Sequence, residues 1–149
     1  MIALACDHAG YELKSHVIEV LEELGLAYKD FGANSPESVD YPVYGARAAY
    51  AVSGGKCDMG IVLCGTGIGI ALAANKVRGI RCAVCSECFS AAMSRLHNDA
   101  NMLALGARVV GSGLAKSIVR TWLTTAFEGD RHARRVGQIT LLEEGRPLE

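Results

Sequence analysis

A short apolar segment runs directly into a glycine-rich turn near the middle of the chain, and a helix-like segment follows the turn. The turn is Cys64-Gly65-Thr66-Gly67-Ile68-Gly69, preceded by Met59-Gly60-Ile61-Val62-Leu63 and followed by a segment that begins at Ile70. This order predicts a buried strand, a tight corner and a helix, which is the repeating unit of a parallel α/β sheet. Because the first N–H groups of a helix have no partner within it, the turn also predicts a place for an anion.

Strands and helices alternate along the rest of the chain. Apolar runs predict strands at residues 2–6, 26–31, 58–63, 79–85 and 101–105, with helical periodicity between them and a last helix at about 132–145. This alternation predicts a three-layer α/β/α Rossmann-like sandwich with a five-stranded parallel sheet. The 149 residues suit a single domain, 1–149.

Composition excludes several classes of protein. Half of the residues are hydrophobic and 21% are charged, which is typical of a globular rather than a disordered chain. The net charge of −1 predicts no nucleic-acid partner, and no apolar run approaches the ~20 residues that span a bilayer. The first residues do not form a signal peptide, so we expect a cytoplasmic protein without a membrane partner and with its six cysteines reduced.

The glycine turn does not match the common nucleotide-binding motifs. Its spacing is Gly-x-Gly-x-Gly rather than Gly-x-Gly-x-x-Gly, and it lacks the Lys-Ser/Thr pair of a P-loop. Two interpretations stay open from the turn alone: a tight corner, or an anion cradle to which Thr66 adds a hydroxyl. The second favours a catalytic role for Cys64, because a helix N-terminus favours the thiolate form of a cysteine.

Other chemically active residues follow the predicted strands. Asp7 and His8 come directly after the first strand, and Arg108 comes shortly after the fifth. Because ligands of parallel α/β sheets bind beyond the carboxyl ends of the strands, we expect these residues to lie near Cys64. A capping role for Asp7 at the following helix is the alternative.

Two polar groups belong to helices. His97 and Asn98 end a predicted helix, either as a polar C-terminus or as an acid and a ligand-binding amide at the cleft. Arg131 and Arg135 are four residues apart and so share one helix face, which suits either solvent or a phosphate.

A metal centre is the competing interpretation of the cysteines. The spacing Cys82-x-x-Cys85-x-x-Cys88 is similar to part of an iron–sulfur motif. An odd offset on one strand points Cys82 and Cys85 to opposite faces of the sheet, so we expect neither a metal site nor another cofactor.

Taken in order, the motifs of the whole chain resemble the ribose-5-phosphate isomerase type B family, which is related to the galactose-6-phosphate isomerase subunits. The resemblance is carried by Cys6-Asp7-His8-Ala9-Gly10-Tyr11-Glu12-Leu13-Lys14, Asp40-Tyr41-Pro42, the glycine turn, Ala73-Ala74-Asn75-Lys76, Arg95-Leu96-His97-Asn98-Asp99-Ala100-Asn101, Leu105-Gly106-Ala107-Arg108-Val109-Val110-Gly111 and Gly129-Asp130-Arg131-His132-Ala133-Arg134-Arg135-Val136.

The resemblance implies an aldose–ketose isomerase that interconverts D-ribose 5-phosphate and D-ribulose 5-phosphate, in the pentose phosphate pathway, without a metal. It implies a homodimer or tetramer whose active sites lie at the subunit interface. The helix at about 132–145 is expected to pack on a partner subunit, with its arginines in the neighbour's site.

The resemblance also implies the catalytic roles. Cys64 is the base, because Ile68 stands where some relatives have a glutamate. His97 is the acid that opens the sugar ring, Asp7 moves hydroxyl protons, and Thr66 helps to hold the enediolate.

The remaining implied residues bind substrate. The backbone of Gly65, Thr66, Gly67, Ile68 and Gly69 holds the enediolate oxygens, and Asn98 orients the sugar. Tyr41 lines the cleft, and the phosphate is held by His8, Arg108, Arg131 and Arg135. The alternatives are an isomerase of a six-carbon sugar phosphate, such as allose or galactose 6-phosphate, and a phosphate-binding regulatory module without turnover.

Overall fold

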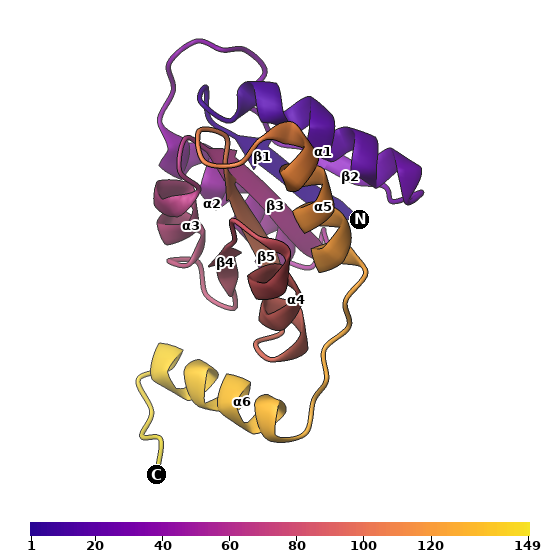
Figure 1. Ribbon diagram of the computed structural model, residues 1–149. Helices are drawn as coiled ribbons and strands as arrows, with labels where there is room; N and C mark the ends of the chain where they lie inside the picture. Colours follow the sequence, from indigo (N-terminus) through magenta and orange to yellow (C-terminus); the bar gives the residue numbers. More distant parts are fainter.

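The computed structural model describes residues 1–149 as five strands and five helices in alternation, followed by a sixth helix at the C-terminal end (Figure 1). The strands are β1 (Ile2–Cys6), β2 (Tyr28–Asp30), β3 (Met59–Cys64), β4 (Cys82–Val84) and β5 (Met102–Gly106). All pairs are parallel, in the order β2-β1-β3-β5-β4. The predicted five-stranded parallel α/β fold is therefore confirmed.

Five of the six helices form the outer layers of the sandwich (Figure 1). They are α1 (Tyr11–Glu23), α2 (Tyr41–Ser53), α3 (Ile68–Ala74), α4 (Cys88–Leu96), α5 (Ser112–Leu123) and α6 (Arg131–Glu143). Helices α1, α4 and α5 cover one face of the sheet, and α2 and α3 cover the other. No helix is both long enough and apolar enough to cross a bilayer.

The two faces of the sheet carry side chains of different size. Leu4, Ile61 and Leu63 pack towards α1 and α5, whereas Ala3 and Ala5 pack towards α2. Because successive side chains of a strand point to opposite faces, β1 supplies both layers of the core. The small residues on the α2 side let that helix approach the sheet closely.

The predicted element boundaries differ most at the edges of the sheet. The structure reduces the strands predicted at 26–31 and 79–85 to three residues each, β2 and β4. Both are edge strands, which have only one neighbour to hydrogen-bond and are often short. Helix α2 starts at Tyr41, and Pro42 is well suited to the first turn of a helix.

The strand order places a crevice beside β1. The chain passes from β1 to β2 on one side and returns to β3 on the other side, so β1 and β3 form a topological switch point. Ligands of open α/β sheets bind at the carboxyl ends of such strands. Gly10 makes this crevice compact, because a Cβ there would lie only 2.6 Å from the Leu63 carbonyl oxygen.

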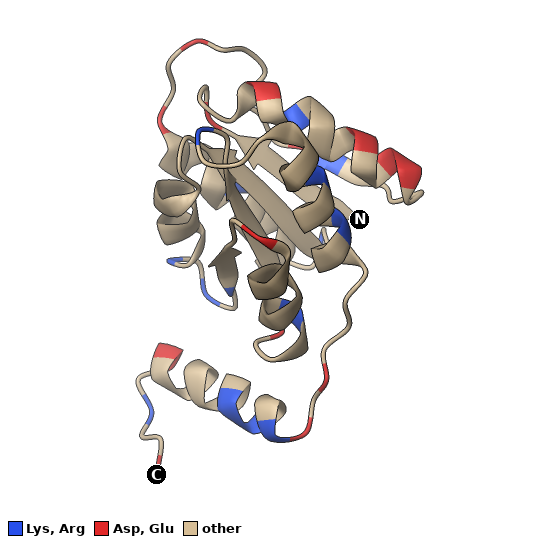
Figure 2. Ribbon diagram, in the orientation of Figure 1, with Lys and Arg blue, Asp and Glu red and all other residues tan.

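Helix α6 stands apart from the sandwich, at the end of an extended segment (Figure 1). His132 is its only buried residue. Arginine residues gather at the start of α6, while acidic residues of α1 lie beside basic residues of α5 (Figure 2). The latter form ion pairs between Glu19 and Lys116 and between Glu23 and Arg120.

Candidate active site

A cleft of about 310 Å³ opens at the carboxyl ends of β1 and β3. It is lined by Asp7, His8, Ala9, Tyr41, Cys64, Gly65, Thr66, Gly69 and Arg108. All of these residues except Ala9 were expected site residues. The fold therefore brings together segments that are far apart in the sequence. The volume is at the small end of the range for ligand sites, as suits a small metabolite.

Cys64 is the last residue of β3 and lies at the bottom of the cleft. Its side chain is buried, and its Sγ accepts a hydrogen bond from the Gly67 N–H at 3.1 Å. The turn therefore directs a backbone donor at the sulfur atom at the end of β3.

Gly67 has a backbone conformation that only glycine adopts without strain. Its φ is +78°, and a Cβ at this position would lie 2.9 Å from the Leu105 carbonyl carbon. On the other side of the same contact, a Cβ at Gly106 would lie 2.6 Å from Thr66. The turn is thus pressed against the end of β5, which fixes its N–H groups in space.

The N–H groups of the turn divide into two sets. Gly67 donates to Cys64 Sγ, and Ile68 donates to Thr66 Oγ1 at 3.2 Å. The N–H groups of Gly65, Thr66 and Gly69 make no hydrogen bond. The N–H groups of Gly67 and Ile68 are used within the turn, whereas the other three are available to a ligand.

Asp7 and His8 face the cleft from the end of β1. Asp7 is 5% exposed, and its Oδ1 accepts the Gly10 N–H at 3.0 Å. The helix-capping interpretation is therefore met in part, because this bond braces the turn before α1 while Asp7 also lines the cleft. The His8 Nδ1 lies 3.1 Å from the Val39 backbone nitrogen, so the loop before α2 fixes the direction of the imidazole.

Tyr41 and Arg108 form two walls of the cleft. The Tyr41 ring packs over Gly69, where a Cβ would come within 2.7 Å of it. The Arg108 guanidinium lies across Gly65, where a Cβ would come within 3.2 Å of Nη1. No salt bridge or hydrogen bond is made by the Arg108 side chain, so its donors are free for an anion.

The structure corrects the placement of His97 and Asn98, which we expected at the cleft. They lie between α4 and β5, at the amino end of β5, whereas Cys64 pairs with Gly106 at its carboxyl end. A five-residue strand separates the two levels by about 15 Å. The reason is topological: a crossover helix carries the chain back to the amino ends of the strands, so the residues that follow it cannot face the cleft of their own chain.

Arg131 and Arg135 are likewise absent from the cleft. Both belong to α6, beside His97 rather than beside Cys64. The chain therefore carries two separate groups of the expected residues. One is the cleft, and the other is the polar end of α4 and α6.

The loop at the end of α4 is held by residues that the sequence did not single out. Asp99 has φ +45°, and its side chain binds Arg81 at 3.3 Å and Arg95 at 2.9 Å. Arg81 also donates to the Asn98 carbonyl oxygen at 3.1 Å. The i,i+4 spacing of Arg95 and Asp99 was the available signal for this clamp.

Cys82 and Cys85 lie on opposite faces of the sheet, as their spacing predicts. Cys82 packs on the α2 and α3 side of the sheet, and Cys85 packs on the opposite side. Burial raises the pKa of Cys82 to about 12 and that of Cys85 to about 11, so both remain protonated thiols. This confirms the prediction from their odd spacing on the strand.

Comparison with known proteins agrees with this arrangement. The chain matches the ribose/galactose isomerase family over residues 2–139. It is 52% identical to ribose-5-phosphate isomerase B of Escherichia coli, over 97% of both chains. It superimposes on ribose-5-phosphate isomerase B of Clostridium thermocellum with a TM-score of 0.95 at 55% identity, covering 97% of both chains.

A solved relative also carries a sugar phosphate. Ribose-5-phosphate isomerase B of Mycoplasma genitalium, described with bound ribulose 5-phosphate, matches with a TM-score of 0.91 at 37% identity, covering 96% of this chain and 95% of its own. The likeness to these proteins extends over nearly the whole chain and includes the fold. The chain therefore belongs to the ribose/galactose isomerase family.

Proposed function

We propose that this chain is an aldose–ketose isomerase that interconverts D-ribose 5-phosphate and D-ribulose 5-phosphate. The observation that carries the proposal is the Cys64 Sγ, which accepts the Gly67 N–H at 3.1 Å beside three backbone N–H groups that have no partner. The names of its close relatives support the same substrate. A base beside an oxyanion cradle is what this reaction requires.

The reaction moves one proton between neighbouring carbons. The Cys64 thiolate takes the proton from C2 of the open-chain aldose, and the electron pair left behind forms the C1–C2 double bond as the C1 oxygen becomes negative. The proton then returns to C1, while the hydroxyl proton on O2 moves to O1 and leaves a ketone at C2. Asp7 lies in the cleft beside Cys64 and is our candidate for moving this hydroxyl proton.

The cradle stabilises the enediolate between these steps. The N–H groups of Gly65, Thr66 and Gly69 are rigidly held and unpaired, so they can donate to the oxygens without reorganisation. The Thr66 hydroxyl accepts from Ile68 and keeps its own hydrogen for a ligand. One well-placed donor of this kind contributes about 3 kcal/mol.

Within the chain, the phosphate is assigned to His8 and Arg108. Both line the cleft at its rim, and the Arg108 guanidinium is free to bind phosphate oxygens in a fork. Tyr41 closes the side of the cleft above Gly69. We assign the other phosphate ligands, Arg131 and Arg135, to a second copy of the chain.

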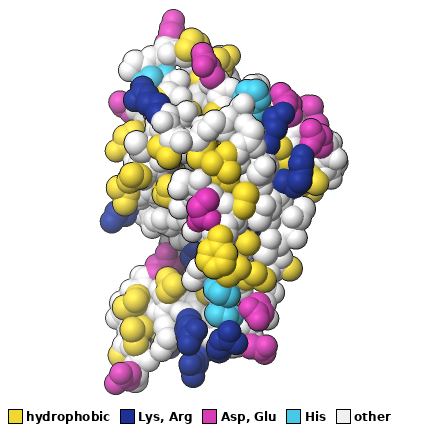
Figure 3. Space-filling model, in the orientation of Figure 1, with side chains coloured by type: hydrophobic (Ala, Val, Ile, Leu, Met, Phe, Trp, Pro, Cys, Tyr) yellow, Lys and Arg dark blue, Asp and Glu magenta, His cyan; other side chains and the backbone are white.

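A second copy also supplies His97 and Asn98 in our proposal. These residues lie far from Cys64 within one chain, but the family resemblance assigns them to the same reaction. Helix α6 supports this arrangement, because it leaves Ile139 and Leu142 exposed beside a groove of about 610 Å³ between itself and the sandwich. The hollow between α6 and the body is visible in Figure 3. An apolar helix face of this kind suits association with a second subunit.

The same proposal places the enzyme in the cytoplasm. All six cysteines are free, and burial raises the pKa of four of them. Free thiols in this number suit a reducing compartment.

The central test is Cys64→Ala, assayed on ribose 5-phosphate with EDTA present. We expect kcat to fall by about three orders of magnitude or more, with the fold unchanged by circular dichroism. Cys88→Ala is the matched control, because this half-buried cysteine is outside the cleft, and it should keep full activity. Near-normal turnover by Cys64→Ala would disprove the role of the thiol.

A mixture of two inactive variants tests the shared site. Cys64→Ala and His97→Asn are unfolded together and refolded, so that half of the dimers contain one copy of each. Such a dimer has one site with both mutations and one site with neither, so the mixture should regain about a quarter of the normal activity. If both residues act within one chain, the mixture stays inactive.

The substrate panel decides the length of the sugar. We compare kcat/KM for ribose 5-phosphate, allose 6-phosphate and galactose 6-phosphate, because the family includes galactose isomerases. The small cleft supports the five-carbon substrate. Faster turnover of a six-carbon sugar would replace this assignment, and binding without any turnover would favour a regulatory module.

A further inference from the structure

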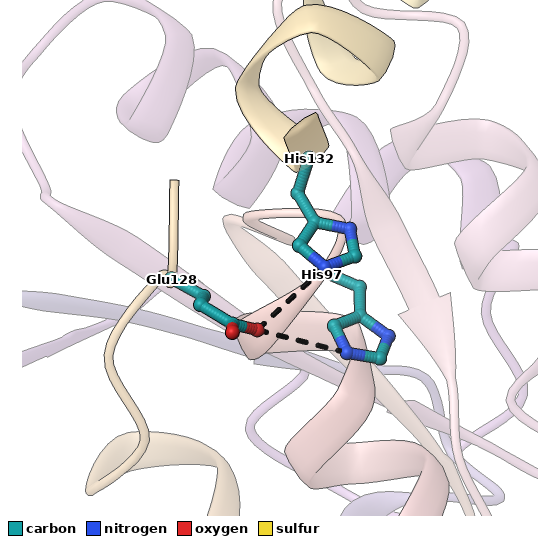
Figure 4. A group of neighbouring side chains, drawn as sticks. All are labelled: His97, Glu128 and His132. Atoms are coloured by element: carbon teal, nitrogen blue, oxygen red, sulfur yellow. Dashed lines mark ion pairs between the residues drawn. The ribbon is translucent and has the colours of Figure 1, made fainter. Parts of the chain in front are cut away.

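Three ionisable side chains meet outside the cleft, where α4 ends and α6 begins (Figure 4). They are His97, Glu128 and His132. The His97 Nε2 lies 3.9 Å from Glu128 Oε2, and the His132 Nε2 lies 3.6 Å from the same oxygen. Of the three, only His97 was expected to take part in the reaction.

The ring geometry of the two histidines does not suit the binding of a metal ion. The two imidazoles are stacked, with their centroids 4.2 Å apart and their planes only 13° from parallel. A metal ion bound by histidine lies in the plane of the ring, along the nitrogen lone pair. Two stacked and nearly parallel rings cannot direct their lone pairs at one ion, so the cluster is not arranged to hold a metal.

Stacking instead gives His97 a flat, uncharged neighbour. His132 is 5% exposed, and its Nε2 has no hydrogen-bond partner. Burial, followed by the neighbouring His97 and Arg131, lowers the pKa of His132, so its ring is neutral near neutral pH. A neutral ring can fix the plane of His97 without repelling a proton on it.

Glu128 restrains the edge of the same imidazole. Its carboxylate pairs only with the two histidines. The other carboxylate nearby, Asp99, is already bound to Arg81 and Arg95. Glu128 is therefore the acidic group available to the Nε2 of His97.

The backbone ties this carboxylate to the end of α4. The Glu128 N–H donates to the Leu96 carbonyl oxygen at 3.1 Å, one residue before His97. This bond fixes Glu128 beside the residue that precedes His97, even though 31 positions separate Glu128 from His97 in the chain. The side chains above this contact are held at a defined separation.

We propose that Glu128 and His132 are positioning residues for His97, Glu128 by holding its Nε2 and His132 by stacking on its face. This leaves Nδ1, which makes no hydrogen bond in the chain, as the nitrogen that exchanges a proton with the sugar. The inference rests on the role of His97 as the acid that opens the ring. In many enzymes a carboxylate binds one ring nitrogen of a histidine and so orients the other ring nitrogen, which transfers the proton.

The first test is Glu128→Ala, with kcat and KM measured on ribose 5-phosphate. Because the variant loses only the fixed orientation of the His97 side chain, we expect kcat to fall 10- to 100-fold while KM changes less than threefold. Sodium formate at high concentration supplies a small carboxylate and should restore part of kcat, whereas sodium chloride should not. Glu128→Gln keeps an acceptor oxygen and should lose less than Glu128→Ala.

The matched control is Glu19→Ala. Glu19 of α1 pairs with His16, at 3.6 Å, and with Lys116, and it belongs to neither group of site residues. We expect its kcat to be unchanged. For His132, Phe keeps a flat ring and Ala removes it, so His132→Phe should retain more activity than His132→Ala.

A double variant separates this inference from the proposed function. If Glu128 acts through His97, then Glu128→Ala should cause no further loss in a His97→Asn background. Multiplied losses, an unchanged kcat in Glu128→Ala, or a loss that formate does not restore would overturn the inference while leaving His97 as the acid. Full activity of His97→Asn alone would overturn the role of His97 itself.

Discussion

Gly67→Ala tests the idea that the turn beside Cys64 is held in one conformation by steric contact. The backbone φ of +78° costs an alanine about 1–2 kcal/mol. The added methyl would also stand 2.9 Å from the Leu105 carbonyl carbon and 3.1 Å from the Gly106 nitrogen, both backbone atoms of the central strand β5. Overpacking against atoms that cannot rotate away costs about a further 1–3 kcal/mol.

We therefore expect Gly67→Ala to lower the free energy of unfolding by about 3 kcal/mol. For a chain of this length that corresponds to a fall in Tm of about 10 °C. The Gly67 N–H would also move away from the Cys64 Sγ, so kcat should fall by more than tenfold even at temperatures where the protein is folded.

The assay combines urea unfolding, followed by circular dichroism, with turnover of ribose 5-phosphate at 20 °C. Gly113→Ala is the control, because a Cβ there meets nothing within 4 Å and the residue lies in helix α5. It should leave stability unchanged or slightly higher. If Gly67→Ala unfolds within 0.5 kcal/mol of the parent and keeps its kcat, the steric account of the turn is refuted.

Three further predictions concern the core and its titratable groups. Because burial raises the pKa of Cys6 and Cys85 to about 11 and that of Cys82 to about 12, these thiols should resist iodoacetamide at pH 8 until the protein is unfolded, as read by mass spectrometry. The pKa of His132 is lowered in the folded state, so the unfolded chain binds a proton there that the folded chain does not. Stability should therefore fall as the pH drops below about 6.5, and His132→Phe should reduce that slope in urea titrations at pH 5–7. Ile118→Ala removes a fully buried side chain and should cost about 2–5 kcal/mol in urea unfolding, and a loss below 1 kcal/mol would mean that α5 repacks.

Local patterns in the sequence were enough to predict the layers of the fold. Continuous apolar runs predicted the ends of β1, β3 and β5 to within one residue. These strands give a clear signal because interior strands are buried on both faces of the sheet. The same signal overestimated the lengths of β2 and β4. Residues next to an edge strand can be apolar because they pack on helices, without pairing in the sheet. The cleft was predictable too, because parallel strands bring their carboxyl ends to one edge of the sheet.

Some contacts had no signal in the sequence. Nothing local indicated that the Gly67 N–H is taken by Cys64, or that Glu128 reaches His97 through a backbone contact with Leu96. Both depend on where a turn or an extended segment lies against a distant element. Such placements are set by packing across the whole molecule.

By itself, the sequence determined the order of the elements, the parallel sheet and the chemistry at the end of β3. The path of the backbone through the fold set which of these residues lie together within one chain. It placed Cys64 and His97 at opposite ends of β5, because a right-handed crossover returns the chain to the amino edge of the sheet before each new strand. Residue type and spacing set the possible chemistry, whereas the path of the backbone set the distances on which that chemistry depends.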